Sequence, residues 1–198
     1  MRVLNLRESL ELLERYSIPV AETHFLRAES DLAHIASRIE YPVVVKPNVS
    51  GHKTEMGVFR SLKSIEEIKS ALKSINTEVA VQRMVDGFEI FLGAKRDDGF
   101  GHVIALGVGG VFAELLENIS FRVVPVGKDD FDEMLSETKL SRIADGFRGF
   151  EFDAENLFRL LKNFERLVIH EDVIEADINP LMASKNEIVA VDARIILS

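Results

Sequence analysis

The sequence has no cysteine and a single glutamine, Gln82. The absence of cysteine excludes disulfides, thiolate metal sites and cysteine catalysis, and we therefore expect a reducing, cytoplasmic compartment. No apolar run approaches the roughly 20 residues that a membrane-spanning helix needs. The first 14 residues mix Arg and Glu with Leu, so we expect no signal peptide.

Basic residues are in the minority, with 24 Lys and Arg against 33 Asp and Glu, and the formal net charge is -9. This balance argues against a nucleic-acid-binding protein, which would present a basic face. The hydrophobic fraction of 46% and the charged fraction of 29% are typical of a soluble globular protein. A chain of 198 residues is long enough for one sizeable core, or for two small lobes that share a cleft.

Apolar spacing and turn residues predict helices and hairpins mixed along the chain. The helical pattern covers residues 6–16, 30–39 with Ser30 as cap, 64–75 with a capping box from Ser64 and Glu67, 128–138 and 153–170. The strand pattern covers residues 20–25, 41–47, 58–62, 78–85, 88–96, 102–108, 121–126, 173–181 and 187–196. Asp86-Gly87 and Asp97-Asp98-Gly99 are hairpin turn signals between successive strands. This order indicates an α+β fold and not a doubly wound parallel sheet.

The last two predicted strands carry a candidate metal site. Asp177 and Asn179 are two residues apart, so they share one face of their strand. A turn centred on residues 185–186 would place Asn179 opposite Asp192, and Asp177 opposite Arg194. Two carboxylates and an amide are oxygen ligands of the kind that Mg²⁺ prefers. A solvated face with cross-strand salt bridges is an equally weighted alternative.

These strands also carry a resemblance to a known family. Residues 175–181 (EADINPL), followed by 191–195 (VDARI), resemble the closing signature of ATP-grasp subunits of acyl-CoA synthetases. That group includes succinyl-CoA synthetase and the archaeal ADP-forming acetyl-CoA synthetases. Further blocks that resemble the family follow in the same order, at residues 41–46, 81–85, 88–93, 100–101, 107–114, 120–122 and 146–149.

The resemblance implies an ATP-grasp fold, in which two α+β lobes hold ATP or ADP with Mg²⁺ in the cleft between them. We expect an N-terminal lobe with its leading helix over residues 1–85, and a C-terminal lobe with the metal site over residues 86–198. The implied activity is that of the nucleotide-binding subunit of an ADP-forming acyl-CoA synthetase, a ligase. No Gly-rich turn of a CoA-binding Rossmann domain is found, so the implied partner is a CoA-binding alpha subunit with a phosphohistidine, in an alpha2beta2 complex.

The family pattern also assigns roles to individual residues. The implied cofactor-binding residues are Lys46, Lys53, Gln82, Met84, Val85, Glu89, Gly109 and Gly110; the metal ligands are Asp177, Asn179 and Asp192; the catalytic residues are His52, Glu114 and Arg122. Two alternatives stay open without the family. Lys46 could extend from a strand end to solvent, and Gly109-Gly110 could be a simple tight turn.

His52 lies in a polar segment where the family carries a histidine that relays a phosphoryl group between the partner and the nucleotide. Imidazole can accept and pass on such a group. Thr54 and Glu55 stand where serine and aspartate are usual, and the segment between Lys46 and His52 is shorter than in the family. The short segment favours one alternative, a non-catalytic nucleotide-sensing or scaffold subunit; another ATP-grasp ligase is a second. The sequence leaves the acyl group and the choice between ADP and GDP open.

Overall fold

Two antiparallel sheets form the frame of the protein, in a computed structural model that describes residues 1–50, 57–110 and 118–198. The larger sheet has the order β1 (Arg2–Val3), β11 (Ala193–Leu197), β9 (Val173–Ala183), β6 (Phe88–Asp97), β7 (Gly101–Val108) and β8 (Ile119–Val123), with β10 (Ile188–Ala190) paired to β9. The smaller sheet has the order β2 (Thr23–Leu26), β5 (Val79–Arg83), β3 (Val43–Pro47) and β4 (Phe59–Leu62).

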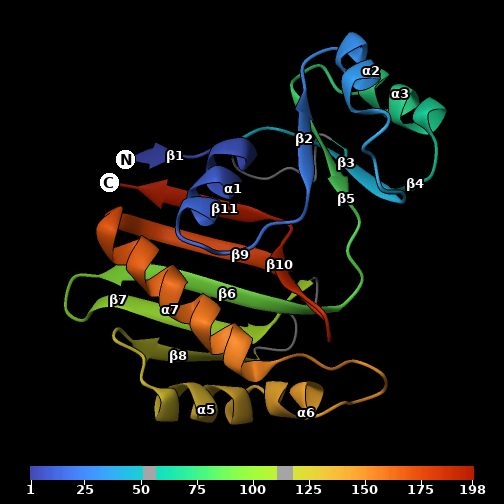
Figure 1. Ribbon diagram of the computed structural model, residues 1–198. Helices are drawn as coiled ribbons and strands as arrows, with labels where there is room; N and C mark the ends of the chain where they lie inside the picture. Colours follow the sequence, from blue (N-terminus) through green and yellow to red (C-terminus); the bar gives the residue numbers. More distant parts are fainter. Residues whose placement is uncertain (51–56, 111–117) are drawn as a thin grey trace.

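Helices cover one face of the large sheet. In Figure 1, α1 (Leu6–Arg15) and α7 (Ala154–His170) lie across this face, and α5 (Lys128–Glu137) and α6 (Leu140–Ala144) lie next to β8. The Asp153 side chain caps α7 by accepting a hydrogen bond from the Glu155 N–H group at 2.9 Å. Leu157, Leu161 and Phe164 of α7 are fully buried, and each such burial contributes about 1.5–3 kcal/mol. Among the described residues, no helix is both long and apolar enough to cross a membrane.

The small sheet has a core of its own. The helix α3 (Ile65–Lys73) packs against β3 and β4, and Figure 1 shows it next to α2 (Leu32–Ile35), which follows the short 3₁₀ helix η1 (Glu29–Asp31). The core residues include Leu32, Val43, Val45, Ile68, Val79 and Val81. Ser64 caps α3 as predicted, by accepting a hydrogen bond from the Glu67 N–H group at 3.2 Å. The Glu67 carboxylate, however, accepts from the Lys63 N–H group and so does not complete the predicted box with Ser64.

The predicted α+β class is confirmed, and two further local predictions are wrong. Asp86-Gly87 is not a hairpin turn, because β5 pairs with β2 and β3 whereas β6 pairs with β7 and β9. This segment instead connects the two sheets. Ser30 does not cap a helix: the turn begins at Glu29, and the Asp31 carboxylate accepts hydrogen bonds from two preceding N–H groups. The turn at residues 97–99 does join an antiparallel pair, β6 and β7.

The leading strand and helix contact the large sheet. Arg2 and Val3 of β1 pair with Leu197 and Ile196 of β11, so the two chain termini lie side by side. Buried leucines of α1 belong to the same hydrophobic core as α7. The division into lobes at residue 85 stays a prediction. The connection between the sheets passes through residues 84–87, and the chain before β2 lies with the large sheet.

Candidate active site

A cleft of ≈ 1370 Å³ lies between the two sheets and is lined by both. Its size is above the range of a typical small-molecule site. The residues that line it come from segments far apart in the sequence. Of the predicted site residues, it brings together Lys46, Gln82, Met84, Val85, Glu89, Asp177, Asn179 and Asp192. His52, Lys53 and Glu114 lie outside the described residues.

Lys46 reaches the cleft from β3. Val44 and Lys46 are two residues apart on this strand and both line the cleft. The Lys46 side chain is buried, with 5% of the residue exposed, and its ammonium group donates a hydrogen bond to the carbonyl oxygen of Val191. The alternative of a lysine that extends to solvent is therefore wrong. Because Val191 directly precedes Asp192, the ammonium group lies beside the predicted metal ligands; its contact with phosphate stays a prediction.

The predicted pairing of the closing strands is confirmed. Asp177 pairs with Arg194 in the ladder between β9 and β11, and the Asn179 N–H group donates to the Asp192 carbonyl oxygen at 3.2 Å. The Ser184 N–H group donates to the Glu187 carbonyl oxygen at 2.9 Å, which closes the turn around residues 185–186. The side chains of Ala176 and Ile178 pack into the core under α7, so alternation along β9 directs Asp177 and Asn179 to the open face.

The same face also carries the salt bridges of the alternative interpretation. Arg194 forms a hydrogen-bonded ion pair with Glu175, and its guanidinium lies 3.7 Å from the Asp177 carboxylate. Asp177 thus lies between the ion pair of Arg194 and Glu175 on one side and the side chains of Asn179 and Asp192 on the other. The salt-bridge interpretation therefore describes part of this face, and the metal site stays a prediction.

The glycine pair packs against the metal candidates. The Gly110 N–H group donates to Asn179 Oδ1 at 2.9 Å, and Gly110 has a positive φ of 68°. A Cβ atom at Gly110 would lie 1.6 Å from Glu89 Oε2. The Gly109 N–H group donates to the Glu89 carbonyl oxygen at 2.7 Å. The positive φ and the close approach of Glu89 both require glycine at position 110. The hydrogen bonds from Gly109 and Gly110 hold Glu89 and Asn179 against the same backbone segment.

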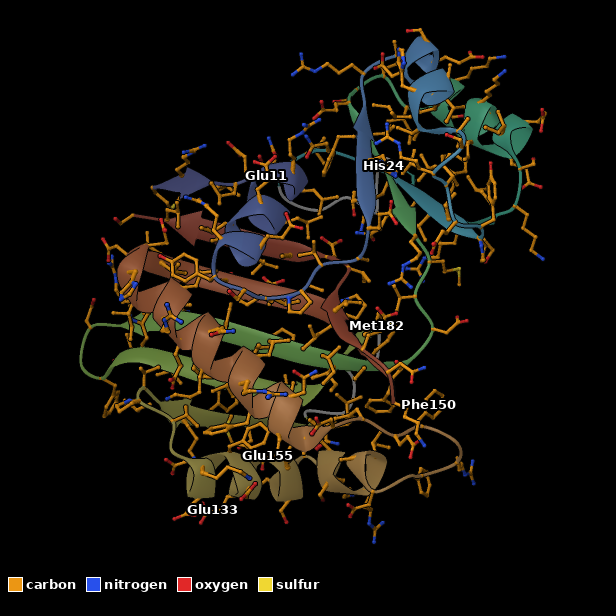
Figure 2. The ribbon with its side chains drawn as sticks, in the orientation of Figure 1. Glu11, His24, Glu133, Phe150, Glu155 and Met182 are labelled. Carbon is orange, nitrogen blue, oxygen red and sulfur yellow. The ribbon has the colours of Figure 1, made fainter. Side chains whose placement is uncertain are left out.

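The connection between the sheets, residues 84–87, also lines the cleft. Gln82 is 2% exposed, and Met84 donates its N–H group to the Pro42 carbonyl oxygen at 3.0 Å. Met182, labelled in Figure 2, lies where this connection approaches β9. Val44 and Val191 also line the cleft with apolar side chains.

Sequence reasoning missed one contact between the lobes. Arg83 forms a two-pronged ion pair with Glu187 at 3.0 and 2.8 Å, and hydrogen bonding to this carboxylate raises the pKa of Arg83. Arg83 belongs to a sequence block that resembles the family, but its partner is 104 residues away. No signal along the chain identifies such a pair.

Arg122 is not brought together with the other candidates. Its guanidinium donates hydrogen bonds to Glu137 at 2.9 Å and to Glu133 at 3.1 Å, both on α5, and the bond to Glu137 raises its pKa. Phe121, the preceding residue of β8, lines the cleft, so Arg122 lies on the helix-covered face. Its catalytic role stays a prediction.

The donor chemistry of the cleft fits Mg²⁺. Asp177, Asn179 and Asp192 supply two carboxylates and an amide oxygen, a set that leaves room for waters and phosphate oxygens. Asn179 Oδ1 accepts one hydrogen bond and keeps a second lone pair. Among the described residues, no group of three or more His, Cys, Asp or Glu side chains is placed to hold a metal ion.

Two facing sheets, with a buried lysine on the small sheet and carboxylates on the large one, define a protein of the ATP-grasp fold class. The chain belongs to the ATP-grasp domain family, whose match covers residues 1–197. The family resemblance of the sequence is thereby confirmed.

Relatives within this family have known names. The chain is 34% identical over 208 residues to the beta subunit of acetate–CoA ligase [ADP-forming] I of Pyrococcus furiosus, a match that covers 96% of this chain and 90% of that one. It is 32% identical to acetate–CoA ligase [ADP-forming] II of Archaeoglobus fulgidus, covering 96% of this chain. It spans only 30% of the length of the Archaeoglobus protein.

Solved structures of one further relative are similar to the whole chain. The dinucleotide forming acetyl-coenzyme A synthetase 1 of Ca. Korarchaeum cryptofilum, in complex with coenzyme A and Ca-AMPCP, has a TM-score of 0.87 and 32% identity. The match covers 100% of this chain and 94% of that one. A second complex of that protein contains Mg-AMPPCP and a phosphohistidine segment that points towards its nucleotide-binding site, with a TM-score of 0.83, 33% identity and coverage of 99% and 93%.

Proposed function

We propose that this chain is the nucleotide-binding subunit of an ADP-forming acyl-CoA synthetase. The overall reaction is acyl-CoA + ADP + phosphate ⇌ carboxylic acid + ATP + CoA. One observation carries the proposal: a single cleft gathers Lys46, the segment around Gln82 and the Asp177, Asn179 and Asp192 oxygens, in a chain related over 96% of its length to such a beta subunit.

The step assigned to this chain is phosphoryl exchange with ADP. An oxygen of the ADP β-phosphate attacks the phosphorus of a phosphohistidine, the N–P bond breaks, and the imidazole keeps the electron pair. The Lys46 ammonium is suited to contact the phosphates because it is a buried point charge at the cleft. Asn179 and Asp192, with Asp177 beside them, would hold Mg²⁺, which neutralises charge on the phosphate oxygens.

The proposed partner is a CoA-binding alpha subunit with a phosphohistidine. Two findings support it: relatives of similar length are named beta subunits, and a related complex contains coenzyme A together with a phosphohistidine segment. We place the assembly, an alpha2beta2 complex, in the cytoplasm. His52 is the proposed relay residue, Lys53 a proposed nucleotide-binding residue and Glu114 a proposed catalytic residue.

The test is phosphorylation of the complete complex, purified with its native partner. Incubation with ATP labelled in its γ-phosphate should give an acid-labile protein phosphate, and acyl-CoA with ADP and phosphate should give ATP. His52→Ala should abolish ATP synthesis and leave ADP·Mg²⁺ binding nearly unchanged. Absence of label in the wild-type complex would support a nucleotide-sensing subunit instead. ATP synthesis at the wild-type rate by the variant would exclude the relay.

A further inference from the structure

The end of strand β3 contacts the large-sheet side of the molecule at a second point, outside the cleft. Asn48 directly follows β3, and its N–H group donates to the Glu78 carbonyl oxygen at 2.8 Å, which extends the pairing of β3 with β5. Asn48 Oδ1 accepts a hydrogen bond at 2.9 Å from the N–H group of Arg7, in the first turn of α1. Asn48, Glu78 and Arg7 do not belong to the described residues that line the cleft.

The amide of Asn48 has one orientation that satisfies both of its neighbours. The Arg7 N–H group is one of the first N–H groups of a helix, which have no partner within the helix itself. A backbone N–H group can only donate, so the amide oxygen of Asn48 faces α1. Its NH₂ group then donates to the Glu78 carboxylate. Asn48 therefore joins the small sheet to the start of α1 through both ends of its side chain.

The Glu78 carboxylate strengthens this junction. The Arg7 guanidinium donates to it from Nε at 3.2 Å and from Nη2 at 2.8 Å, and Arg27 Nε donates to it at 3.1 Å. The Glu78 side chain is 15% exposed, so solvent screens these contacts only in part. Arg27 directly follows β2 and its contact stays within the small sheet, whereas the contact of Arg7 comes from α1.

The helix α1 is in turn fixed to the strand that follows the proposed metal ligand Asp192. Its buried leucines belong to the core of the large sheet, and the Leu4 N–H group just before it donates to the Ile195 carbonyl oxygen at 3.0 Å. Figure 1 shows α1 and β1 beside β11, which begins at Ala193. The start of α1 and the Asp192 backbone are therefore parts of one packed unit.

The strand β3 thus reaches this unit at two points, Lys46 and Asn48, which are roughly 7 Å apart along a strand. The Lys46 ammonium donates to the Val191 carbonyl oxygen, next to Asp192. A phosphate group that binds Lys46 has to compete with this carbonyl for the ammonium. The Asn48 contacts lie outside the cleft, so they persist during such an exchange and keep the strand end at the same distance from Asp192.

We propose that Asn48, held between Arg7 and Glu78, is a positioning residue that keeps Lys46 within reach of the phosphates of a bound nucleotide. This inference rests on the proposed function and adds to it a residue outside the cleft. Asn48 does not touch the nucleotide. It acts through Lys46, because it fixes the strand end that carries this lysine relative to the metal-binding candidates.

A substitution at Asn48 tests the proposal in two backgrounds. Asn48→Ala removes both side-chain hydrogen bonds and leaves the residues that line the cleft unchanged. In calorimetry it should weaken ADP·Mg²⁺ binding about tenfold, the effect of one lost hydrogen bond to a charged group. In a Lys46→Ala protein the same substitution should cause no further loss, because the residue through which it acts is absent. A merely structural role would lower the affinity in both backgrounds alike.

The two arginines at Glu78 supply a matched control. Arg7→Met and Arg27→Met each remove hydrogen bonds to the same carboxylate, but only Arg7 joins the two sheets. Arg7→Met should weaken ADP·Mg²⁺ binding several-fold. Arg27→Met should keep the wild-type affinity, and thermal denaturation of both variants shows how much stability each has lost. Equal losses of affinity in the two variants would overturn the inference.

Failure of the inference differs from failure of the proposed function. If the wild-type chain binds ADP·Mg²⁺ and Asn48→Ala binds it equally well, the positioning role is wrong and nucleotide binding stands. The same holds if the losses from Asn48→Ala and Lys46→Ala add in the double variant. If the wild-type chain binds no nucleoside diphosphate with Mg²⁺, the proposed function falls and this inference with it.

Discussion

Arg83 of β5 and Glu187, in the turn between β9 and β10, form two parallel hydrogen bonds at 3.0 and 2.8 Å. Their side chains are 27% and 34% exposed. Partial burial reduces screening by solvent, and two-pronged geometry is the strongest form of an arginine–carboxylate pair. The pair therefore links the positions of the two sheets directly.

A double-mutant cycle measures this link. Arg83→Met, Glu187→Gln and the double variant should give a coupling of about 1 kcal/mol in the free energy of unfolding. The pair of Lys185 and Glu151 is the control, because its side chains are 75% and 42% exposed. Its coupling should be close to zero, and equal coupling in the two pairs would contradict the argument from burial.

Gly110 is required for two separable reasons, its positive φ and its contact with Glu89. Gly110→Ala adds a Cβ atom 1.6 Å from Glu89 Oε2, so it should destabilise the protein and weaken ADP·Mg²⁺ binding. Gly101→Ala is the matched control, since Gly101 has a φ of +78° and no atom within 4 Å of an added Cβ. It should show only the backbone effect, about 1 kcal/mol in unfolding free energy, with unchanged binding.

A second variant distinguishes the clash from the backbone effect. Removal of the carboxylate in Gly110→Ala/Glu89→Ala should restore part of the stability that Gly110→Ala loses. Chemical denaturation and calorimetry measure the two properties. Identical losses in Gly110→Ala and Gly101→Ala would mean that the Glu89 contact has no energetic effect.

The proposed metal ligands are tested through the Mg²⁺ dependence of nucleotide binding. Asp192→Ala and Asn179→Ala should each weaken ADP·Mg²⁺ binding by about tenfold or more, because each removes an oxygen ligand. The far-UV circular dichroism should stay unchanged. Asp172→Asn serves as control, since Asp172 pairs with Arg96 outside the cleft. ADP·Mg²⁺ affinity at the wild-type level in both alanine variants would remove the metal-site assignment.

Glu78 connects α1 to the small sheet and should make stability depend on pH. Burial by itself would raise the pKa of Glu78, but hydrogen bonds from Asn48, Arg27 and Arg7 outweigh it, and the pKa lies below the usual 4.5. A carboxylate with a depressed pKa stabilises the fold above its unfolded pKa, and this contribution is lost as the pH falls through the folded pKa. We expect wild-type stability to fall below a pH of about 4.5.

Glu78→Gln removes the titrating group. It should lower the free energy of unfolding at neutral pH by about 1–2 kcal/mol and flatten the loss of stability between about pH 5 and about pH 3. Denaturation curves across this range provide the measurement. A variant whose stability has the wild-type pH dependence would show that other carboxylates control acid unfolding.

Local patterns in the sequence were sufficient for the elements whose partners are close along the chain. The register of β9 on β11 follows from a single turn at residues 185–186, because antiparallel pairing then proceeds by counting outward. The helices α3 and α7 follow from helical spacing of apolar residues, and α3 also from its cap Ser64. The candidate residues Asp177, Asn179 and Asp192 were found for the same reason.

Tertiary structure alone decided the relations between distant segments. Asp86-Gly87 has the local chemistry of a hairpin turn, yet the strands on its two sides pair in different sheets. Arg122 belongs to a sequence block that resembles the family, but its guanidinium donates a hydrogen bond to the acidic face of α5 and so points away from the cleft. The Thr23–Gln82 and Arg83–Glu187 contacts join residues 59 and 104 positions apart. Such pairs depend on which surfaces are buried together, a property of the whole folded chain that no window of sequence contains.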